Sequence, residues 1–179
     1  GAHPKDAVRP PSIDEFERWQ EAAEGNIRLV TLAAEWEGAP AYIRHITGRG
    51  VVAAIGHMAA NHEQIEAAVD AGATLSTHLG NGAGASLPRH PNFLWSQMAE
   101  DRLAASLIVD GIHLGKAFLT VALRAKGLER LVLITDAVAP AGCAPGPYKL
   151  GEVDVILHAE GKVTLTDGQR LAGSSLHMD

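Results

Sequence analysis

The chain has 179 residues, of which 46% are hydrophobic, and this is enough for one globular domain with a real core. Its 15 basic and 21 acidic residues give a net charge of −6 without a basic cluster, so nucleic acid is not expected as a partner. No apolar run approaches the roughly 18 residues of a membrane span, and residues 1–11 lack the pattern of a secretion signal. The single cysteine, Cys143, is typical of the reducing cytoplasm, which is the expected location.

The first half of the chain alternates between helix and strand. Ser12 and Glu15 have the spacing of a capping box, so the first helix is predicted to run to about Glu24. Pro40 suits the first turn of a second helix, and apolar residues at helical spacing before Gly72 predict a third. In chain order, this half comprises a helix to residue 24, a strand over 29–35, a helix over 41–47, a strand over 51–57, a helix over 63–71 and a strand over 74–78.

The second half begins with a long Gly-rich loop over residues 79–91, a type that is usually functional or mobile in a compact domain. Two further pairs of helix and strand follow. Their helices end near Met98 and Lys126, and their strands cover residues 104–110 and 131–136. The strands recur at the spacing of βα units joined by right-handed crossovers, which predicts an α/β fold.

Five such units do not close a (β/α)₈ barrel, because a closed barrel needs eight units and about 250 residues. The sequence therefore predicts either an open doubly wound sheet or part of a larger barrel. Beyond residue 136, the alternating runs 153–157 and 162–165 predict a β-hairpin near the C-terminus. Residues 171–178 are apolar and have no stop signal, so we expect the chain to be a piece of a longer protein.

All five predicted strands end in a residue that can bind a metal or transfer a proton, and these residues are Glu35, His57, His78, Asp110 and Asp136. The C-terminal ends of parallel strands meet at one edge of a sheet. We therefore predict that two histidines and three carboxylates surround one pocket. A strand that simply stops at a solvent-facing polar residue is the alternative for each position taken singly.

His57 and His78 are the strongest candidates for metal ligands. Neutral imidazoles on rigid strand ends suit a catalytic divalent metal of the zinc type, which needs one more ligand and an open position for water. The alternative for each is a buried structural histidine. Asp136 could take a proton from the attacking water and deliver it to a leaving amine, or it could cap a helix. Asp110 and His113 form a tight turn, in which we expect His113 to face substrate rather than only to stabilise the turn.

Seven motifs occur in the order found in one enzyme family. They are Gly-Ala-His-Pro at 1–4, Val-Thr-Leu-Ala-Ala-Glu at 30–35, Gly-His at 56–57, Thr-His-Leu-Gly-Asn at 77–81, Asp-Gly-Ile-His at 110–113, Thr-Asp-Ala at 135–137 and Leu-Ala-Gly-Ser at 171–174. With these motifs the chain resembles a central to C-terminal piece of the N-acetylglucosamine-6-phosphate deacetylase family, which belongs to the amidohydrolase superfamily.

The resemblance implies an incomplete (β/α)₈ barrel of amidohydrolase type in one partial domain over residues 1–179, without the first barrel strands and the small β-sandwich domain. It implies that His57 and His78 bind a divalent metal, zinc in the first place and iron or manganese as alternatives. Asp136 becomes the catalytic acid and base. The implied reaction is hydrolysis of N-acetylglucosamine 6-phosphate to glucosamine 6-phosphate and acetate, and the piece alone is expected to be inactive.

The same resemblance implies contacts to substrate. His3 would lie near the substrate carbonyl, and His113 would contact the sugar. Asn81 and the backbone of Gly82 would hold the phosphate. Arg89 would reach the phosphate bound in the neighbouring subunit, since the family forms homodimers.

The chain departs from the family pattern in two places. The family's third metal ligand is a glutamate that precedes Gly-Ala-His, whereas this sequence begins at Gly1, and Glu35 belongs to a different strand and is not assigned to the metal. The phosphate loop reads Asn81, Gly82, Ala83, Gly84 where the family usually has Asn-Ala-Met-Pro. Another small N-acyl substrate, or a sugar-phosphate-binding piece without catalysis, therefore stays an alternative. An open-sheet nucleotide binder is excluded, because no strand is followed by a Gly-x-Gly-x-x-Gly or Walker loop.

Overall fold

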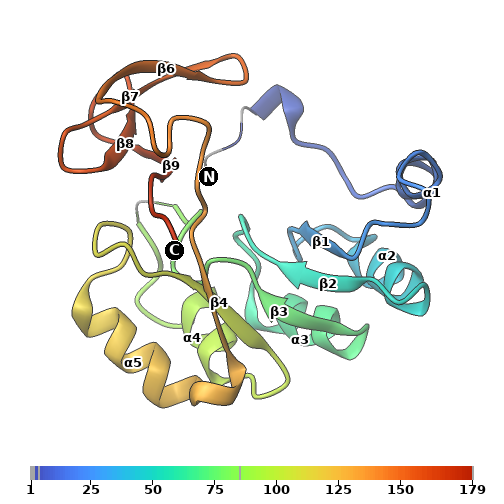
Figure 1. Cartoon of the computed structure of the whole chain (residues 1–179). Coiled ribbons are helices and arrows are strands. Elements are labelled where there is room, and N and C mark those ends of the chain that lie inside the picture. The colour runs from blue at the N-terminus through green and yellow to red at the C-terminus, as the bar shows by residue number, and fades with distance from the viewer. Residues whose placement is uncertain (1–2, 4, 85, 179) are drawn as a thin grey trace. The chain divides into compact units, whose positions relative to one another are not determined.

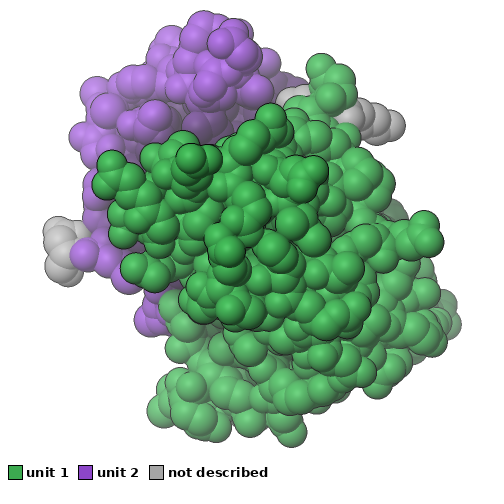
Figure 2. All heavy atoms as spheres, turned by 90° about the vertical axis from the view of Figure 1, so that its right-hand side faces the viewer, with its two compact units in different colours: residues 1–106, 122–132 green, residues 107–121, 133–179 purple. Residues whose placement is uncertain are grey.

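The computed structural model describes residue 3, residues 5–84 and residues 86–178. The chain divides into two compact units, which Figure 2 shows in different colours. Unit 1 comprises residues 1–106 and 122–132, and unit 2 comprises residues 107–121 and 133–179. A single partial barrel domain over residues 1–179 stays a prediction.

One sheet contains five strands in the order β1-β2-β3-β4-β5 (Figure 1). The pairs β1–β2, β2–β3 and β3–β4 are parallel, so the predicted α/β architecture with a parallel sheet is confirmed. Since spatial order follows chain order, each connection crosses to the next strand in the same direction. The strands are β1 (Leu29–Leu32), β2 (Val52–Ile55), β3 (Ala73–Ser76), β4 (Ala104–Ile108) and β5 (Leu131–Ile134).

Each strand ends two or three residues before the polar residue with which we predicted it to end. The reason is visible in the backbone of three of these residues: His57, His78 and Asp136 have φ angles of 51°, 31° and 51°. A left-handed residue cannot continue an extended ladder of hydrogen bonds. The apolar runs therefore give the positions of the strands correctly, but the polar residues lie in the loops that follow them.

The helices agree closely with the predicted ones. Ser12 caps α1 by accepting a hydrogen bond from the Glu15 N–H at 3.3 Å, but the Glu15 carboxylate pairs with Arg9, so only half of the capping box forms. Asn61 and Gln64 form a complete capping box at the start of α3. None of the helices in the described part of the chain has the length and apolar character needed to cross a bilayer. The helices are α1 (Ile13–Ala22), α2 (Ala39–Gly48), α3 (His62–Asp70), α4 (Phe93–Ala99) and α5 (Lys116–Lys126), with 3₁₀ turns η1 (Lys5–Ala7) and η2 (Leu128–Arg130).

Apolar side chains of α1, α2 and α3 form the main core of unit 1 against the first strands. Phe16, Ile43 and Ile46 come from the first two helices and are fully buried. Ile55 on β2 and Ile65 on α3 meet them in the same cluster. Each buried side chain of this size stabilises the fold by about 1.5–3 kcal/mol. This core fixes β2 and β3, and therefore the loops that leave their C-terminal ends.

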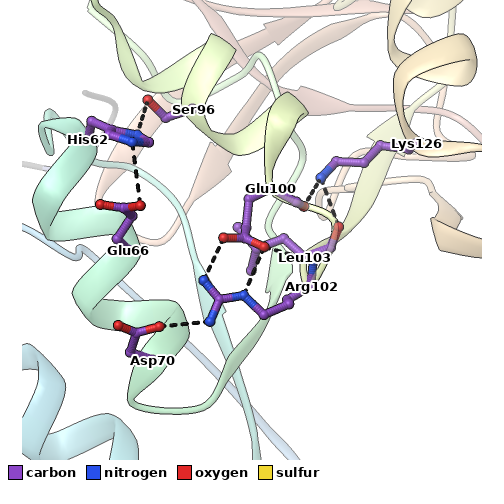
Figure 3. Close-up of polar contacts among 8 residues, drawn as sticks. All are labelled: His62, Glu66, Asp70, Ser96, Glu100, Arg102, Leu103 and Lys126. Atoms are coloured by element: carbon purple, nitrogen blue, oxygen red, sulfur yellow. Dashed lines mark hydrogen bonds and ion pairs between the residues drawn. The ribbon is translucent and has the colours of Figure 1, made fainter.

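Polar contacts link the C-terminal ends of α3, α4 and α5 in unit 1 (Figure 3). Arg102 donates to Asp70 at the end of α3 at 2.7 Å and to Glu100, just after α4, at 2.7 Å and 2.9 Å. The ammonium group of Lys126 donates to the carbonyl oxygens of Glu100 and Leu103 at 2.7 Å and 2.8 Å. Burial, reinforced by the charge of Arg130, lowers the pKa of Lys126 to about 8. These contacts set the start of β4, which carries a further residue of the candidate site.

Unit 2 contains an antiparallel sheet of four strands in the order β6-β7-β8-β9. The predicted hairpin is correct and consists of β7 (Val153–Leu157) and β8 (Lys162–Leu165). The prediction was incomplete, because β6 (Gly146–Leu150) and β9 (Leu171–Ser174) flank this hairpin. Pro147 lies within β6, where a proline is tolerated because β6 is an edge strand. Val155, Leu157 and Val163 form a small separate core.

Candidate metal centre

His57 and His78 lie together in unit 1, just after the adjacent parallel strands β2 and β3. Their Nε2 atoms are 2.7 Å apart, and their ring centroids are 4.5 Å apart with the planes at 78°. Two imidazole nitrogens at this distance need a proton or a cation between their lone pairs. The prediction that the two side chains meet at this edge of the sheet is confirmed. Their role as metal ligands stays a prediction.

Backbone strain marks the same residues. Among the described residues other than glycine, four have positive φ angles, and three of these four are His57, His78 and Asp136. A left-handed conformation costs a residue with a side chain free energy and persists only where the surroundings determine it. Such residues are concentrated at functional sites. The strain therefore supports the choice of these three residues independently of their chemistry.

The charge state of His57 favours cation binding. Burial, followed by the positive charges of His78 and His3, lowers the pKa of His57 to about 4. His57 is therefore neutral at physiological pH and has a lone pair to offer. His3 is also close, with its ring centroid 4.5 Å from that of His57. The structure thus brings His3, which we predicted near the substrate carbonyl, to the same place.

Ser106 on β4 positions His78, a role that is not among the predictions made from the sequence. The Ser106 hydroxyl accepts from the His78 N–H at 2.7 Å and donates to the Ser76 carbonyl at 3.1 Å. The Ser106 carbonyl accepts from the Leu79 N–H at 2.9 Å. Ser106 is buried within an otherwise apolar strand. A lone polar residue in such a strand is the pattern that could have revealed it.

The loop after His78 folds back onto His57. The Asn81 N–H donates to the His78 carbonyl at 2.9 Å, and the side-chain nitrogen of Asn81 is buried without a partner in the described part of the chain. Gly82 has φ +65°, and a Cβ atom added to it would lie 2.8 Å from Nδ1 of His57. Asn81 and Gly82 therefore lie at the histidine pair. Arg89, further along this loop, is exposed.

Glu35 braces the loop that carries His57. One carboxylate oxygen accepts from the Ala59 N–H at 3.0 Å, and the Glu35 carbonyl accepts from the Gln64 side chain at 3.3 Å. The other carboxylate oxygen is buried without a partner among the described residues. Within the described residues, no group of three His, Cys, Asp or Glu side chains is arranged to hold a metal ion.

The histidine pair fits a zinc-type ion as two of its ligands. Two nitrogen donors converge on one point, and His57, by its low pKa, is neutral there. The Nδ1 atoms of both rings are buried and have no partner among the described residues, so neither ring is committed elsewhere by a hydrogen bond. Imidazole is a preferred ligand of zinc, iron and similar ions.

In unit 2, Asp110 and His113 form a buried pair. Asp110 accepts from the N–H groups of Ile112 and His113 at 2.8 Å each and from Nδ1 of His113 at 2.6 Å. Burial of the Asp110 carboxyl opposes its ionisation, but the hydrogen bonds from His113 and Ile112 outweigh burial and lower its pKa. Asp110 thus stabilises the turn and fixes Nδ1 of His113 as the donor. Nε2 of His113 is left as an acceptor for another group.

Asp136, also in unit 2, is exposed and does not cap a helix, because the next regular element is the strand β6. Its carbonyl accepts from the Ser174 N–H at 2.9 Å. The alternative of a helix cap is therefore wrong. The carboxylate is left available for chemistry.

Over its whole length the chain is similar to sugar-phosphate deacetylases. It is 36% identical over 179 residues to N-acetylglucosamine-6-phosphate deacetylase of Bacillus subtilis, and the aligned region covers 100% of this chain and 45% of that relative. It is 37% identical over 179 residues to N-acetylgalactosamine-6-phosphate deacetylase of Escherichia coli, with coverage of 100% and 47%. The solved N-acetyl-D-glucosamine-6-phosphate deacetylase of Mycobacterium smegmatis matches with a TM-score of 0.91 and 39% identity, covering 98% of this chain and 46% of that one. No family model matches the chain.

The chain thus spans slightly less than half the length of these relatives. The similarity extends through both units, since nearly all of the chain is covered in each comparison. The resemblance drawn from the motifs is confirmed: over nearly all of its length, the chain is similar to slightly less than half of each of these N-acetylglucosamine- and N-acetylgalactosamine-6-phosphate deacetylases.

Proposed function

We propose that the protein containing this chain hydrolyses N-acetylglucosamine 6-phosphate to glucosamine 6-phosphate and acetate. The observation that carries this proposal is the pair of facing imidazoles, 2.7 Å apart. It occurs in a chain whose relatives are named N-acetylglucosamine-6-phosphate deacetylase. Water attacks the carbonyl carbon of the acetamide, the bond from carbon to nitrogen breaks, and the amine nitrogen gains a proton. The product amine and acetate then separate.

His57 and His78 would hold a divalent metal, zinc in the first place, with the remaining ligand supplied by another part of the protein. A metal bound there would polarise the carbonyl and lower the pKa of water. His57 suits this role because it is neutral at physiological pH, as its pKa of about 4 requires. Ser106 and Gly82 would keep the two rings in place.

Asp136 would move the proton that the reaction requires. Its carboxylate takes a proton from the attacking water and delivers it to the leaving nitrogen, since an amine anion is too basic to leave unprotonated. His3 would lie near the substrate carbonyl. His113, with Nδ1 committed to Asp110, would accept a hydrogen bond from a sugar hydroxyl through Nε2.

Asn81 and the backbone of Gly82 would bind the phosphate. The unpartnered, buried side-chain nitrogen of Asn81 supports this, because it is a donor without an acceptor among the described residues. Arg89 would reach the phosphate in the neighbouring subunit of a homodimer, and its exposure is compatible with that role. The five-stranded sheet would be part of a (β/α)₈ barrel completed by the rest of the protein.

The deciding experiment uses the full-length protein loaded with zinc, and it measures acetate released from three substrates. N-acetylglucosamine 6-phosphate should be hydrolysed, and N-acetylglucosamine without phosphate should be a poor substrate. N-acetylgalactosamine 6-phosphate is the second candidate substrate, because a relative with 37% identity is named N-acetylgalactosamine-6-phosphate deacetylase. Tight binding of the sugar phosphates without acetate release would favour a binding protein and contradict the proposal.

A further inference from the structure

The main chain around Asp136 is bound to the last strand of the antiparallel sheet. On one side β9 pairs with β8. On its other side, Ala137 forms a parallel bridge with Ser174. The Ser174 N–H donates to the Asp136 carbonyl at 2.9 Å, and the Val138 N–H donates to the Ser174 carbonyl at 3.0 Å. Two hydrogen bonds therefore hold the peptide units on either side of Ala137.

This close approach requires a glycine at position 173. Gly173 has φ +79°, and an added Cβ atom would lie 2.2 Å from Cγ1 of Val138 and 3.3 Å from the Asp136 carbonyl oxygen. No side chain fits at 2.2 Å, because carbon atoms in contact are separated by about 3.5–4.0 Å. Val138 has little room to withdraw, since it packs against the core formed by Val155, Leu157 and Val163.

Ser174 is itself well fixed. It is 2% exposed, and its hydroxyl accepts from the Leu176 N–H at 2.8 Å. Asp136, in contrast, has the unfavourable φ of 51°. A residue in this conformation needs surroundings that determine it. In unit 2, β9 provides them through the two hydrogen bonds at Ser174.

We infer that Gly173 is a positioning residue for Asp136: by allowing β9 to lie against residues 136–138, it holds Asp136 in the backbone conformation from which its carboxylate transfers the proton. This inference rests on the proposed function, in which Asp136 is the acid and base. It assigns a role in proton transfer to a residue that has no functional group of its own.

The test compares four variants of the full-length, zinc-loaded protein. Gly173→Ala should reduce kcat at least tenfold and alter the pH profile of kcat, while KM and zinc content stay within twofold of wild type. Gly168→Ala is the matched control, since Gly168 also has a positive φ, +71°, but an added Cβ would meet nothing within 4 Å. It should retain kcat within twofold. The double variant Gly173→Ala with Val138→Ala removes the clashing methyl group and should recover most of the lost kcat relative to Val138→Ala alone.

The outcomes separate the two proposals. A wild-type protein without deacetylase activity would overturn the proposed function. If wild type is active, equal kcat for Gly173→Ala and Gly168→Ala would overturn this inference alone. Loss of zinc or of folded protein in proportion to the loss of kcat, without rescue in the double variant, would also overturn it, because that pattern describes a purely structural role. If Gly173→Ala does not fold, the double variant and Val138→Ala provide the same comparison.

Discussion

The Nε2 atoms of His57 and His78 lie 2.7 Å apart, although 21 positions separate the two residues in the chain. Both residues follow their strands by two positions, and both have left-handed backbones. Equivalent placement on two adjacent parallel strands is what brings the rings together. The pair is therefore a property of the sheet and of two strained turns.

Replacing either His57 or His78 by alanine should abolish stoichiometric binding of metal. One imidazole would remain, and the site would have lost one of the few protein ligands that a catalytic ion normally has. The measurement is elemental analysis of the full-length protein after dialysis. His62→Ala is the control, because the His62 side chain is 51% exposed and contacts Ser96 instead. Wild-type metal content in His78→Ala would remove His78 from the site.

Gly82→Ala should weaken metal binding and lower the thermal stability. The added methyl group would lie 2.8 Å from Nδ1 of His57, and the φ of +65° adds a backbone cost of about 1 kcal/mol. Gly84→Ala serves as the comparison, because a Cβ there would meet only the Ser86 carbonyl, at 3.5 Å. Titration with zinc and thermal unfolding distinguish the two variants. Identical zinc affinity in both would show that the loop does not press on His57.

Asp136→Asn in the full-length protein should retain metal but lose turnover by two or more orders of magnitude. Each factor of ten corresponds to about 1.4 kcal/mol of barrier, and the amide cannot take up and deliver the proton. Asp154→Asn, a change at a side chain that is 65% exposed in the same unit, should leave kcat unchanged. Acetate release under saturating substrate is the measurement. Turnover like that of wild type would exclude Asp136 from the mechanism.

Ser106 and Ser76 form a matched pair of buried hydroxyl groups with opposite expectations. Ser106→Ala leaves the His78 N–H and the Ser76 carbonyl without their partner, which should cost about 1–3 kcal/mol of unfolding free energy and weaken zinc binding. The Ser76 hydroxyl has no partner among the described residues, so Ser76→Ala should be neutral or slightly stabilising. Urea unfolding and zinc titration check both. A greater loss in Ser76→Ala would contradict the assignment.

Because of Lys126, we expect the free energy of unfolding to depend on pH in the alkaline range. Its pKa is about 8 in the folded protein against 10.5 for the ordinary side chain. Between these values the unfolded chain binds a proton that the folded chain has released, so the free energy of unfolding rises with pH in this window. Relative to Lys126→Met, wild type should gain up to about 3 kcal/mol from the lower to the upper end of this window.

Urea unfolding at the two ends of this window measures the change at Lys126. Lys149→Met is the control, since the Lys149 side chain is 66% exposed and should contribute no comparable pH dependence. A difference between wild type and Lys126→Met that stays constant with pH would show that Lys126 titrates normally.

The sequence predicts the parallel part of the fold well because each of its strands lies in a mostly apolar run, and each helix has a capping residue or a glycine near its boundary. Ser12 before α1 and Gly72 after α3 are examples. The antiparallel strands β6 and β9 are not predicted from the sequence, because they contain Pro147 and Gly173, which are residues that usually interrupt a strand. Pro147 is tolerated here because β6 is an edge strand, and Gly173 is needed because β9 lies close to Val138.

At the candidate site, the two candidate metal ligands can be selected from the sequence, whereas the residues that hold them in place cannot. His57 and His78 are recognisable as candidates by their residue type and by their position after a predicted strand. Ser106 contacts His78 across a strand pairing, 28 positions further along the chain; it stands out locally as a lone polar residue in an apolar strand, but the sequence does not indicate which group it contacts. Gly82 lies so close to His57 that a Cβ atom would not fit between them, and this proximity can be seen only in the folded loop.

Hydrogen bonds from main-chain N–H groups to side-chain oxygens fix both histidine-bearing loops: the Ser106 hydroxyl accepts from the N–H of His78, and the Glu35 carboxylate accepts from the N–H of Ala59 beyond His57. Under the proposed function, we expect loss of the ion to leave these loops assembled, because none of these hydrogen bonds involves it. Exchange of one metal for another should then require no refolding, in contrast to zinc fingers, which unfold when they are emptied. The identity of the ion in the cell would be governed by supply and by the preference of imidazole among divalent metals.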